Sequence, residues 1–290
     1  MIGRELHPQI RLDAERVARL VLAEDGPFDL TGDVTVSPGA TGSGAIEYRS
    51  GGIAAGLPYA GAVAQASGVD IAWNAGEGDG VPPMASLAMV RGPLSALLRA
   101  ERPLLNLLQR ACGIANATRA AVDAVAGTPC HILHTRKTAP GLRLFDIAAV
   151  LAGGGMAHRI DLAHTVMVKD NHWSALARRG ETVADALQRA RSRGAVACYV
   201  EVESIEQLTA ACAAGATRLL IDNQLPETVR EFAELARRLS PGIEIEATGG
   251  IDLSNVRAYA QAGADFVSIG ALTHSVRAAD LALEVEDRPM

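Results

Sequence analysis

Aromatic residues are scarce in this chain: Phe, Tyr and Trp together make up 3% of its 290 residues, although the apolar fraction reaches 49%. Ala, Val, Leu and Gly therefore have to fill the interior. Such small aliphatic residues suit short strands that alternate with Ala-rich helices, as in α/β folds. A chain of this length can bury two domains or one large α/β barrel.

Long apolar runs and paired cysteines are also missing. No apolar stretch has the length that crosses a membrane, and the first residues do not have the pattern of a signal peptide. The four cysteines show no C-x-x-C spacing, which argues against a zinc site and against a disulfide framework. Isolated thiols are usually reduced and buried, so we expect a cytoplasmic protein with no membrane contact.

Several catalytic signatures are absent as well. No G-x-G-x-x-G follows the first strand of the second half, which disfavours a dinucleotide-binding sheet, and no Ser-His-Asp or Cys-His arrangement stands out. The net charge of −6 disfavours nucleic-acid binding. Yet residues 135–169 carry five Lys or Arg against two Asp. A local cationic pocket in an acidic protein predicts a small polyanion as ligand.

The first hundred residues predict a small α+β domain. Residues 11–24 have the apolar spacing of an amphipathic helix, and residues 25–35 are rich in turn formers. Residues 42–57 and 76–93 place Gly and Pro turns around short strands. Two helices should follow, over 93–111 and 114–126, with a break at Gly113.

From about residue 130 the pattern becomes a regular alternation of strand and helix. The expected strands cover 131–135, 165–169, 198–203, 219–222, 243–247 and 266–270, and the expected helices cover 181–193, 204–214, 226–238 and 253–262. This alternation indicates parallel strands with crossover helices, and the count favours a closed or nearly closed β/α barrel. In such barrels the chemistry lies at the carboxyl ends of the strands, and here those ends carry charge or glycine.

Carboxylates follow two of these strands. Glu201 and Glu203 are two apart, so their side chains share a face, and Asp222 ends the next strand. Two readings stay open: a structural ion pair of this acid group with Lys169 or Arg159, or oxygen ligands for Mg²⁺ that the substrate's phosphates help to hold. Mg²⁺ rarely needs a complete protein cage, so Glu201 and Asp222 would be enough.

Glycines end the last two strands. Thr248-Gly249-Gly250 precedes a helix expected near Ser254, and Gly270-Ala271 ends the next strand. Backbone N–H groups can approach an anion closely at glycine, and a helix N-terminus adds partial positive charge. An isolated glycine pair would only indicate a tight turn, but two neighbouring glycine-ended strands predict a phosphate cradle.

The cations Arg136, Lys137 and Arg159 stand where strands or loops end, and Arg binds carboxylates in bidentate fashion. His158 fits a ligand and a buried core histidine equally well. His131, His134 and His164 are interpreted as structural. Arg102, in a helix far from the barrel sequence, has no role that the residues alone reveal.

Taken together, these motifs resemble the quinolinate phosphoribosyltransferase family, also known as carboxylating nicotinate-nucleotide pyrophosphorylases. The resemblance covers nearly the whole chain, in the stretches ERPLLNLLQRACGIA (101–115), HTRKTAPGLRL (134–144), GGGMAHRI (153–160), VMVKDNHW (166–173), VEVES (200–204), LLIDN (219–223), EATGGI (246–251) and SIGALTHSV (268–276). The combination of TRKTAPGLR, KDNH and ALTHS is highly specific.

The resemblance implies the fold and the reaction. It implies an N-terminal α/β sandwich over residues 1–115, completed by about 275–290, and an incomplete β/α barrel over 116–274. The reaction would be decarboxylating phosphoribosyl transfer from phosphoribosyl pyrophosphate (PRPP) to quinolinate, giving nicotinate mononucleotide, pyrophosphate and CO₂ in NAD biosynthesis. Members of the family pair head to tail as homodimers, whether or not the dimers assemble further into hexamers.

It also implies roles for single residues. Arg102 would reach the neighbouring subunit's active site, and the pyridine dicarboxylate would be bound by Arg136, Lys137, His158, Arg159 and Lys169. Thr135 would also belong to the substrate-binding residues. Glu201 and Asp222 would hold the ribose hydroxyls and Mg²⁺. The 5′-phosphate would lie against Thr248, Gly249, Gly250, Ile269, Gly270 and Ala271, with His274 nearby. The residues expected to take part in catalysis are Lys137, Lys169, Glu201 and Asp222, and either lysine could assist the decarboxylation.

Two departures and two alternatives go with this resemblance. Thr248 replaces a common Ser and keeps its hydroxyl, whereas Trp173 replaces a smaller aliphatic residue with an effect that the sequence does not reveal. One alternative is a paralogue that ribosylates another anionic acceptor, as in a related group associated with molybdenum transport. That group tends to lose the KDNH, EVE and ALTHS elements present here. The other alternative is a non-catalytic sensor of pyridine or PRPP.

Overall fold

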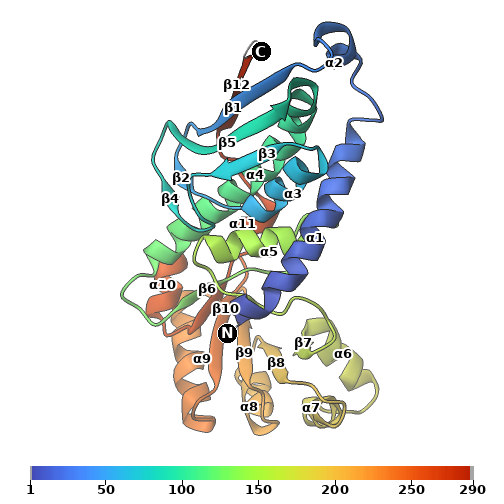
Figure 1. Cartoon of the computed structure of the whole chain (residues 1–290). Helices are drawn as coiled ribbons and strands as arrows, with labels where there is room; N and C mark the ends of the chain where they lie inside the picture. The colour runs from blue at the N-terminus through green and yellow to red at the C-terminus, as the bar shows by residue number, and fades with distance from the viewer. Residues whose placement is uncertain (1, 288–290) are drawn as a thin grey trace. The chain divides into compact units, whose positions relative to one another are not determined.

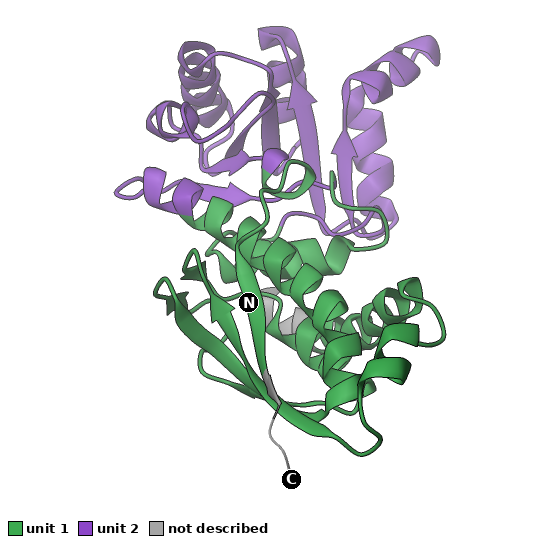
Figure 2. Cartoon of the chain, turned by 90° about the horizontal axis from the view of Figure 1, so that it is seen from above, with its two compact units in different colours: residues 1–119, 137–157, 272–290 green, residues 120–136, 158–271 purple. Residues whose placement is uncertain are grey.

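The computed structural model describes residues 2–287 and divides the chain into two compact units, each assembled from separate stretches (Figure 2). Unit 1 contains the chain up to Arg119, Lys137–Ala157 and the chain from Leu272; unit 2 contains Ala120–Arg136 and His158–Ala271. The sequence placed 137–157 with the barrel, whereas here this segment belongs to unit 1. Of the expected C-terminal segment, residues 288–290 lie outside the described residues, as does Met1 of the N-terminal domain.

Unit 1 is built on an antiparallel sheet with the strand order β12-β1-β5-β3 (Figure 1). The strands are β1 (Thr41–Tyr48), β3 (Asp70–Trp73), β5 (Ala85–Pro93) and β12 (Leu281–Asp287). A separate ribbon pairs β2 (Gly52–Ile53) with β4 (Gly80–Val81). Because β12 pairs with β1 from Gly42 to Tyr48, residues 281–287 complete a sheet that begins near residue 41.

The helices of this unit pack around that sheet. They are α1 (Ile2–Glu24), α2 (Leu30–Thr35), α3 (Leu57–Ala66), α4 (Leu94–Ala124), α5 (Arg143–Ala152) and α11 (Ala271–His274); α4 ends and α11 starts in unit 2. Tyr59 of α3 meets the ring of Phe145 of α5 edge to face, with centroids 4.8 Å apart. Both aromatic side chains are fully buried, so this ring pair forms part of the core of unit 1.

The predicted helix break at Gly113 is wrong, because α4 runs through it without interruption. A Cβ at Gly113 would collide with the backbone carbonyl of Arg277 and with Ala278. The glycine therefore allows close approach of the returning chain and does not end the helix. Residues 25–35 also differ from expectation, since the turn-rich sequence contains the short helix α2. Helix α3, with Pro58 in its first turn, was not anticipated.

Unit 2 confirms the predicted parallel α/β architecture. Its six strands are parallel and lie in the order β6-β11-β10-β9-β8-β7. They are β6 (His131–Leu133), β7 (Thr165–Val168), β8 (Ala197–Val202), β9 (Arg218–Asp222), β10 (Glu244–Thr248) and β11 (Phe266–Ser268). Among the described residues β6 and β7 form the two edges of the sheet and do not pair, which makes the barrel incomplete.

The crossover helices are α6 (Asp170–Arg178), α7 (Val183–Ser192), α8 (Ile205–Ala213), α9 (Pro226–Leu239) and α10 (Val256–Gln261). Local sequence explains where several of them begin. Thr182 caps α7 in a reciprocal pair of hydrogen bonds with Asp185, and Ser204 caps α8. In α9, Pro226 stands in the first turn, and the buried residues recur at helical spacing.

The four cysteines are buried and free, as the sequence predicted. Burial raises the pKa of Cys112 to about 11 and that of Cys130 to about 12, so both thiols stay protonated near neutral pH. No helix in the described part of the chain combines the length and apolarity that would carry it across a membrane.

Candidate active site

The carboxyl ends of the six parallel strands of unit 2 bring together most of the residues that the sequence singled out (Figure 1). Neighbouring parallel strands end at the same edge of a sheet, so side chains that follow them share one rim. The rim residues are Thr135 and Arg136 after β6, Lys169 after β7, Glu201 in β8, Asp222 in β9, Thr248 in β10, and Ile269, Gly270 and Ala271 after β11.

Two arginines on this side of unit 2 have the character of an anion site. The Nε atom of Arg136 is buried and has no hydrogen-bond partner among the described residues. Burial lowers the pKa of Arg159, as does the charge of Arg136, while Glu246 acts in the opposite direction. Within the described part of unit 2, neither guanidinium forms an ion pair with a carboxylate. Two neighbouring cations without acidic partners favour a ligand with negative charge.

Lys169 holds the carboxylate of Glu201. Its Nζ lies 2.6 Å from Glu201 Oε2, which realises the ion pair considered from the sequence. Lys169 precedes α6, and its backbone N–H donates to Nδ1 of His172 at 3.0 Å. The indole Nε1 of Trp173 donates to the backbone carbonyl of Glu201 at 2.9 Å. The bulky residue that the sequence left unexplained therefore ties α6 to the end of β8.

Three carboxylates converge at the ends of β8 and β9. Glu201, Glu203 and Asp222 each present an oxygen within 4.8 Å of the others. Glu201 is buried and Glu203 exposed, and Asp222 Oδ2 accepts a hydrogen bond from Asn223 at 2.7 Å. Such a set of oxygen donors suits a hard divalent cation. Glu203 was not among the predicted metal ligands, although its two-residue spacing from Glu201 had suggested a shared face.

The glycines after β10 have the backbone conformation of a tight anion-binding loop. Gly249 has φ +88° and Gly250 φ +61°, both in the left-handed region. A Cβ at Gly249 would also collide with Asn223, whose backbone N–H donates to the Thr248 carbonyl at 2.9 Å. Only glycine fits at position 249, whereas at 250 the backbone conformation alone disfavours a side chain.

The helix expected near Ser254 starts later. Helix α10 begins at Val256 and has six residues. In the turn before it, Asp252 Oδ1 accepts the backbone N–H of Ser254 at 2.8 Å. The first backbone N–H groups of this turn are therefore partly satisfied by the carboxylate of Asp252.

His158 uses both ring nitrogens inside the protein. Its Nε2 lies 3.1 Å from Glu246 Oε2, and its Nδ1 lies 2.7 Å from the backbone nitrogen of Arg159. His134 is fully buried, which fits its structural interpretation, and its Nε2 accepts the His158 N–H at 3.0 Å. Of the two readings for His158, the geometry favours the satisfied core histidine.

Three predicted site residues belong to unit 1. Arg102 of α4 is 61% exposed, and its ion-pair partner is the adjacent Glu101 at 3.8 Å. Lys137 is exposed, and its backbone carbonyl accepts a hydrogen bond from Thr273 Oγ1 at 2.9 Å. His274, the next residue along α11, is exposed, so Lys137 and His274 are brought near one another within this unit.

Asp146, which the sequence counted against the cationic cluster, is engaged elsewhere. It is fully buried and accepts two hydrogen bonds from Arg110, through Nε and a terminal nitrogen, each at 2.9 Å. The backbone N–H of Ala139 is its third donor, also at 2.9 Å. Arg110 in turn donates to the Thr273 carbonyl at 3.0 Å. Asp146 therefore anchors the loop after Lys137, and its own charge is engaged by Arg110.

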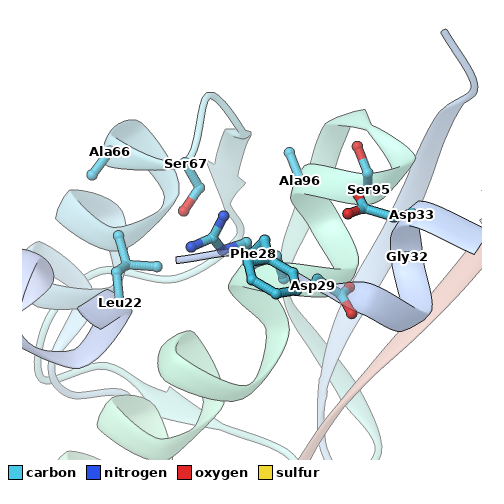
Figure 3. Close-up of a pocket in the computed structure, with 10 residues that line it drawn as sticks. Leu22, Phe28, Asp29, Gly32, Asp33, Ala66, Ser67, Ser95 and Ala96 are labelled. Carbon is cyan, nitrogen blue, oxygen red and sulfur yellow. The ribbon is translucent and has the colours of Figure 1, made fainter. Parts of the chain in front are cut away.

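A separate hollow of about 490 Å³ lies within unit 1, between the end of α1, α2, α3 and α4 (Figure 3). Phe28, Asp29 and Asp33 line one side of it, and Ser67 lies on the other. Arg99, which also lines it, donates to the Gly26 carbonyl at 2.8 Å. None of the residues that the sequence connects with chemistry lines this hollow, so it is not the candidate active site.

Comparison with known proteins gives a consistent result. Residues 29–112 match the model of the quinolinate phosphoribosyl transferase N-terminal domain, and residues 114–284 match the model of its C-terminal domain. The nicotinate-nucleotide pyrophosphorylase [carboxylating] of Mycobacterium leprae is 38% identical over 94% of this chain and 98% of its own. The human protein of the same name is also 38% identical, over 91% of this chain and 89% of its own.

Solved structures agree with these relatives. The nicotinate-nucleotide pyrophosphorylase of Francisella tularensis superposes with a TM-score of 0.88 at 31% identity, covering 95% of this chain and 97% of that one. The named relatives are of the phosphoribosyltransferase type, and an incomplete parallel barrel with cations, carboxylates and glycines at its strand ends agrees with that class of enzyme. The chain belongs to the quinolinate phosphoribosyl transferase family.

Proposed function

We propose that this protein transfers the phosphoribosyl group of PRPP to quinolinate with loss of CO₂, giving nicotinate mononucleotide and pyrophosphate for NAD biosynthesis. The observation that carries the proposal is the composition of one rim of unit 2. Arg136, whose buried Nε has no hydrogen-bond partner among the described residues, a carboxylate trio and a left-handed glycine pair lie at the carboxyl ends of strands of a single parallel sheet. The relatives described above bear the name of the same carboxylating activity.

The two carboxylates of quinolinate would be bound by the cationic residues. Arg136 and Arg159 are suited to bidentate contacts, and the buried Nε of Arg136 is a donor that such a ligand would satisfy. Thr135, Lys137 and Lys169 would complete the pocket. Nicotinate has only one carboxylate and would leave some of these cations without a partner, so it should bind poorly.

PRPP would lie against the carboxylates and the glycines. Glu201 and Asp222 would accept hydrogen bonds from the ribose hydroxyls and, with Glu203 beside them, would hold Mg²⁺. When bound, Mg²⁺ supplies positive charge that offsets the negative charge of the departing pyrophosphate. Thr248, Gly249 and Gly250 would bind the 5′-phosphate through backbone N–H groups, together with Ile269, Gly270 and Ala271.

The chemistry needs no protein nucleophile. The pyridine nitrogen attacks the anomeric carbon as the bond to pyrophosphate breaks, through a transition state of oxocarbenium character. Glu201 and Asp222 would stabilise the positive charge that develops on the ribose. The bond between C2 and its carboxylate then breaks, CO₂ leaves, and the electron pair on C2, stabilised by the ring's positive nitrogen, takes up a proton. Lys169 and Lys137 are the candidates for shielding this carbanion.

We further propose that the protein works in the cytoplasm as a homodimer whose sites are shared. Arg102 is exposed and has only a neighbouring glutamate as its ion-pair partner among the described residues. A guanidinium in this setting is available to a second copy of the chain, where it would contact the dicarboxylate.

The deciding experiment incubates the protein with PRPP, MgCl₂ and quinolinate labelled in its C2 carboxylate, and follows labelled CO₂ and pyrophosphate. Stoichiometric release of both supports the proposal. Pyrophosphate release with another anionic acceptor, but no CO₂ from quinolinate, would indicate the paralogue. Binding without any release would indicate the sensor. The matched control is nicotinate, and equal turnover of the two acids would contradict the role given to the cationic pocket.

A further inference from the structure

A carboxylate that the sequence analysis passed over lies at the centre of unit 2. Glu246 of β10 is 1% exposed, and three side chains donate to it. His158 and Arg218 reach its Oε2 at 3.1 and 3.0 Å, and the Ser268 hydroxyl donates to its Oε1. Burial alone would raise the pKa of Glu246, but the hydrogen bond from His158 and the charge of Arg218 hold it below its usual range. Glu246 is therefore a buried, ionised acceptor.

The contacts of His158 fix its protonation. A neutral imidazole has one donor and one acceptor nitrogen. The backbone N–H of Arg159 donates to Nδ1 at 2.7 Å, so Nδ1 carries no proton. The proton is on Nε2, from which it points to Glu246. The imidazole thus connects a buried negative charge to the backbone of a predicted substrate-binding arginine.

A second histidine extends this connection to the end of β6. The backbone N–H of His158 donates to Nε2 of His134 at 3.0 Å, so His134 carries its proton on Nδ1. That nitrogen lies 3.1 Å from the carbonyl of Thr135, to which it can donate. Thr135 directly precedes Arg136. Residues 158–159 are therefore joined to the backbone that carries the other arginine.

Arg218 holds Glu246 in place through the same oxygen that His158 contacts. Its guanidinium lies between the rings of Tyr199 and Phe266, 4.6 and 3.8 Å from their centroids. It also donates to Glu244 at 2.7 Å. A cation fixed between two aromatic rings has little freedom to move, so the carboxylate that it binds is fixed as well.

We propose that Glu246 and His158 are positioning residues for quinolinate recognition: they fix the backbone that carries Arg159 and, through His134, the backbone that carries Arg136. His158 then acts without binding the substrate, in contrast to the role that the family resemblance implies. This inference depends on the proposed function, because it assumes that these two arginines bind the dicarboxylate.

The charge of Glu246 supports the same role. Arg159 is partly buried, and its burial and the nearby charge of Arg136 both lower its pKa. Glu246 offsets this effect at Arg159 without forming an ion pair that would occupy the guanidinium. The arginines therefore remain available for the two carboxylates of a ligand.

The test replaces Glu246 by Gln, which keeps the shape and removes the charge, and measures KM for each substrate separately. We expect KM for quinolinate to rise about tenfold, the scale of one charge-assisted hydrogen bond, while KM for PRPP stays within about twofold. The matched control is Glu244→Gln, which removes a carboxylate from the same Arg218 but does not touch His158. It should leave both KM values unchanged.

A double variant separates positioning from direct binding. If His158 positions Arg159, Glu246→Gln added to His158→Ala should change KM for quinolinate by less than about twofold, because the connection is already broken. If the two substitutions instead raise KM for quinolinate independently, so that their factors multiply, the inference is wrong. It is also wrong if Glu246→Gln leaves both KM values unchanged, as the Glu244→Gln control should.

The proposed function and this inference fail in different ways. If the unmodified protein releases no CO₂ from quinolinate, the proposed function fails before any variant is compared. If it does, and only thermal stability responds to Glu246→Gln, the network is merely structural and the inference fails alone. If Glu246→Gln does not fold, Ser268→Ala perturbs the same carboxylate through its other oxygen. KM for quinolinate should then rise while KM for PRPP stays the same, and an unchanged KM for quinolinate would contradict the inference.

Discussion

Removing the carboxylate of Asp146 should destabilise unit 1 strongly. Asp146 is fully buried and accepts three hydrogen bonds at 2.9 Å, two from Arg110 and one from the backbone of Ala139. Breaking a buried ion pair by deleting one partner costs about 3–5 kcal/mol. The side chain of Arg110 is 27% exposed and keeps its bond to Thr273, so solvent and that bond recover part of the loss. We expect Asp146→Ala to lower the free energy of unfolding by roughly 2–4 kcal/mol.

The chain offers a suitable probe, since it has two tryptophans, Trp73 in unit 1 and Trp173 in unit 2. In a Trp173→Phe background, urea unfolding followed by Trp73 fluorescence reports on unit 1. The double variant Arg110→Met with Asp146→Leu, which leaves no unpaired buried charge, should recover much of the lost stability. A loss below about 1 kcal/mol for Asp146→Ala, or a double variant no better than the single one, would refute the argument.

Three further predictions concern the proposed site. Arg102→Ala and Lys169→Ala proteins should each be inactive but folded, and mixing them should restore part of the activity through hybrid dimers; no recovery despite subunit exchange would contradict a shared site. Trp173→Phe removes the indole donor to the β8 carbonyl and should raise KM for PRPP about fivefold; an unchanged KM would show that this bond does not position the carboxylates. Gly249→Ala should reduce PRPP binding and the melting temperature more than Gly250→Ala, because only the former adds a collision to an unfavourable φ; calorimetry that ranks them in the opposite order would contradict the cradle geometry.

The parallel half of the fold could be predicted from the sequence because its pattern is local. Each buried strand of unit 2 is a short apolar run that ends in charge or glycine, and six such ends meet at one rim once the strands are parallel. The strand pattern alone therefore predicted that Asp222 and Glu201 lie close together, and the structure places their carboxylate oxygens within 4.8 Å of one another. Family resemblance supplied further expectations, above all the role proposed for Arg102, which no local pattern indicated.

Other features depend on partners that are distant in the sequence. The continuity of α4 through Gly113 is decided by a carbonyl at Arg277, which no helical pattern contains. In the sequence, Glu246 is one polar residue of an alternating strand. Its contacts with His158 and Arg218, which are distant in the sequence, appear only in the folded structure. The charge count set Asp146 against the cationic cluster, but in the structure its carboxylate pairs with Arg110. Charge counts along a sequence omit which charges are already engaged.

The pairing of β12 with β1 has a consequence for how the protein is made. A ribosome would release β1 more than two hundred residues before the strand that covers its outer edge, whereas every strand of unit 2 emerges in between. During that interval the nascent chain exposes an unpaired β-edge, which is a site for mispairing with other chains. Unit 2 can therefore mature first, and the final strand acts as the closing step that protects unit 1 from aggregation.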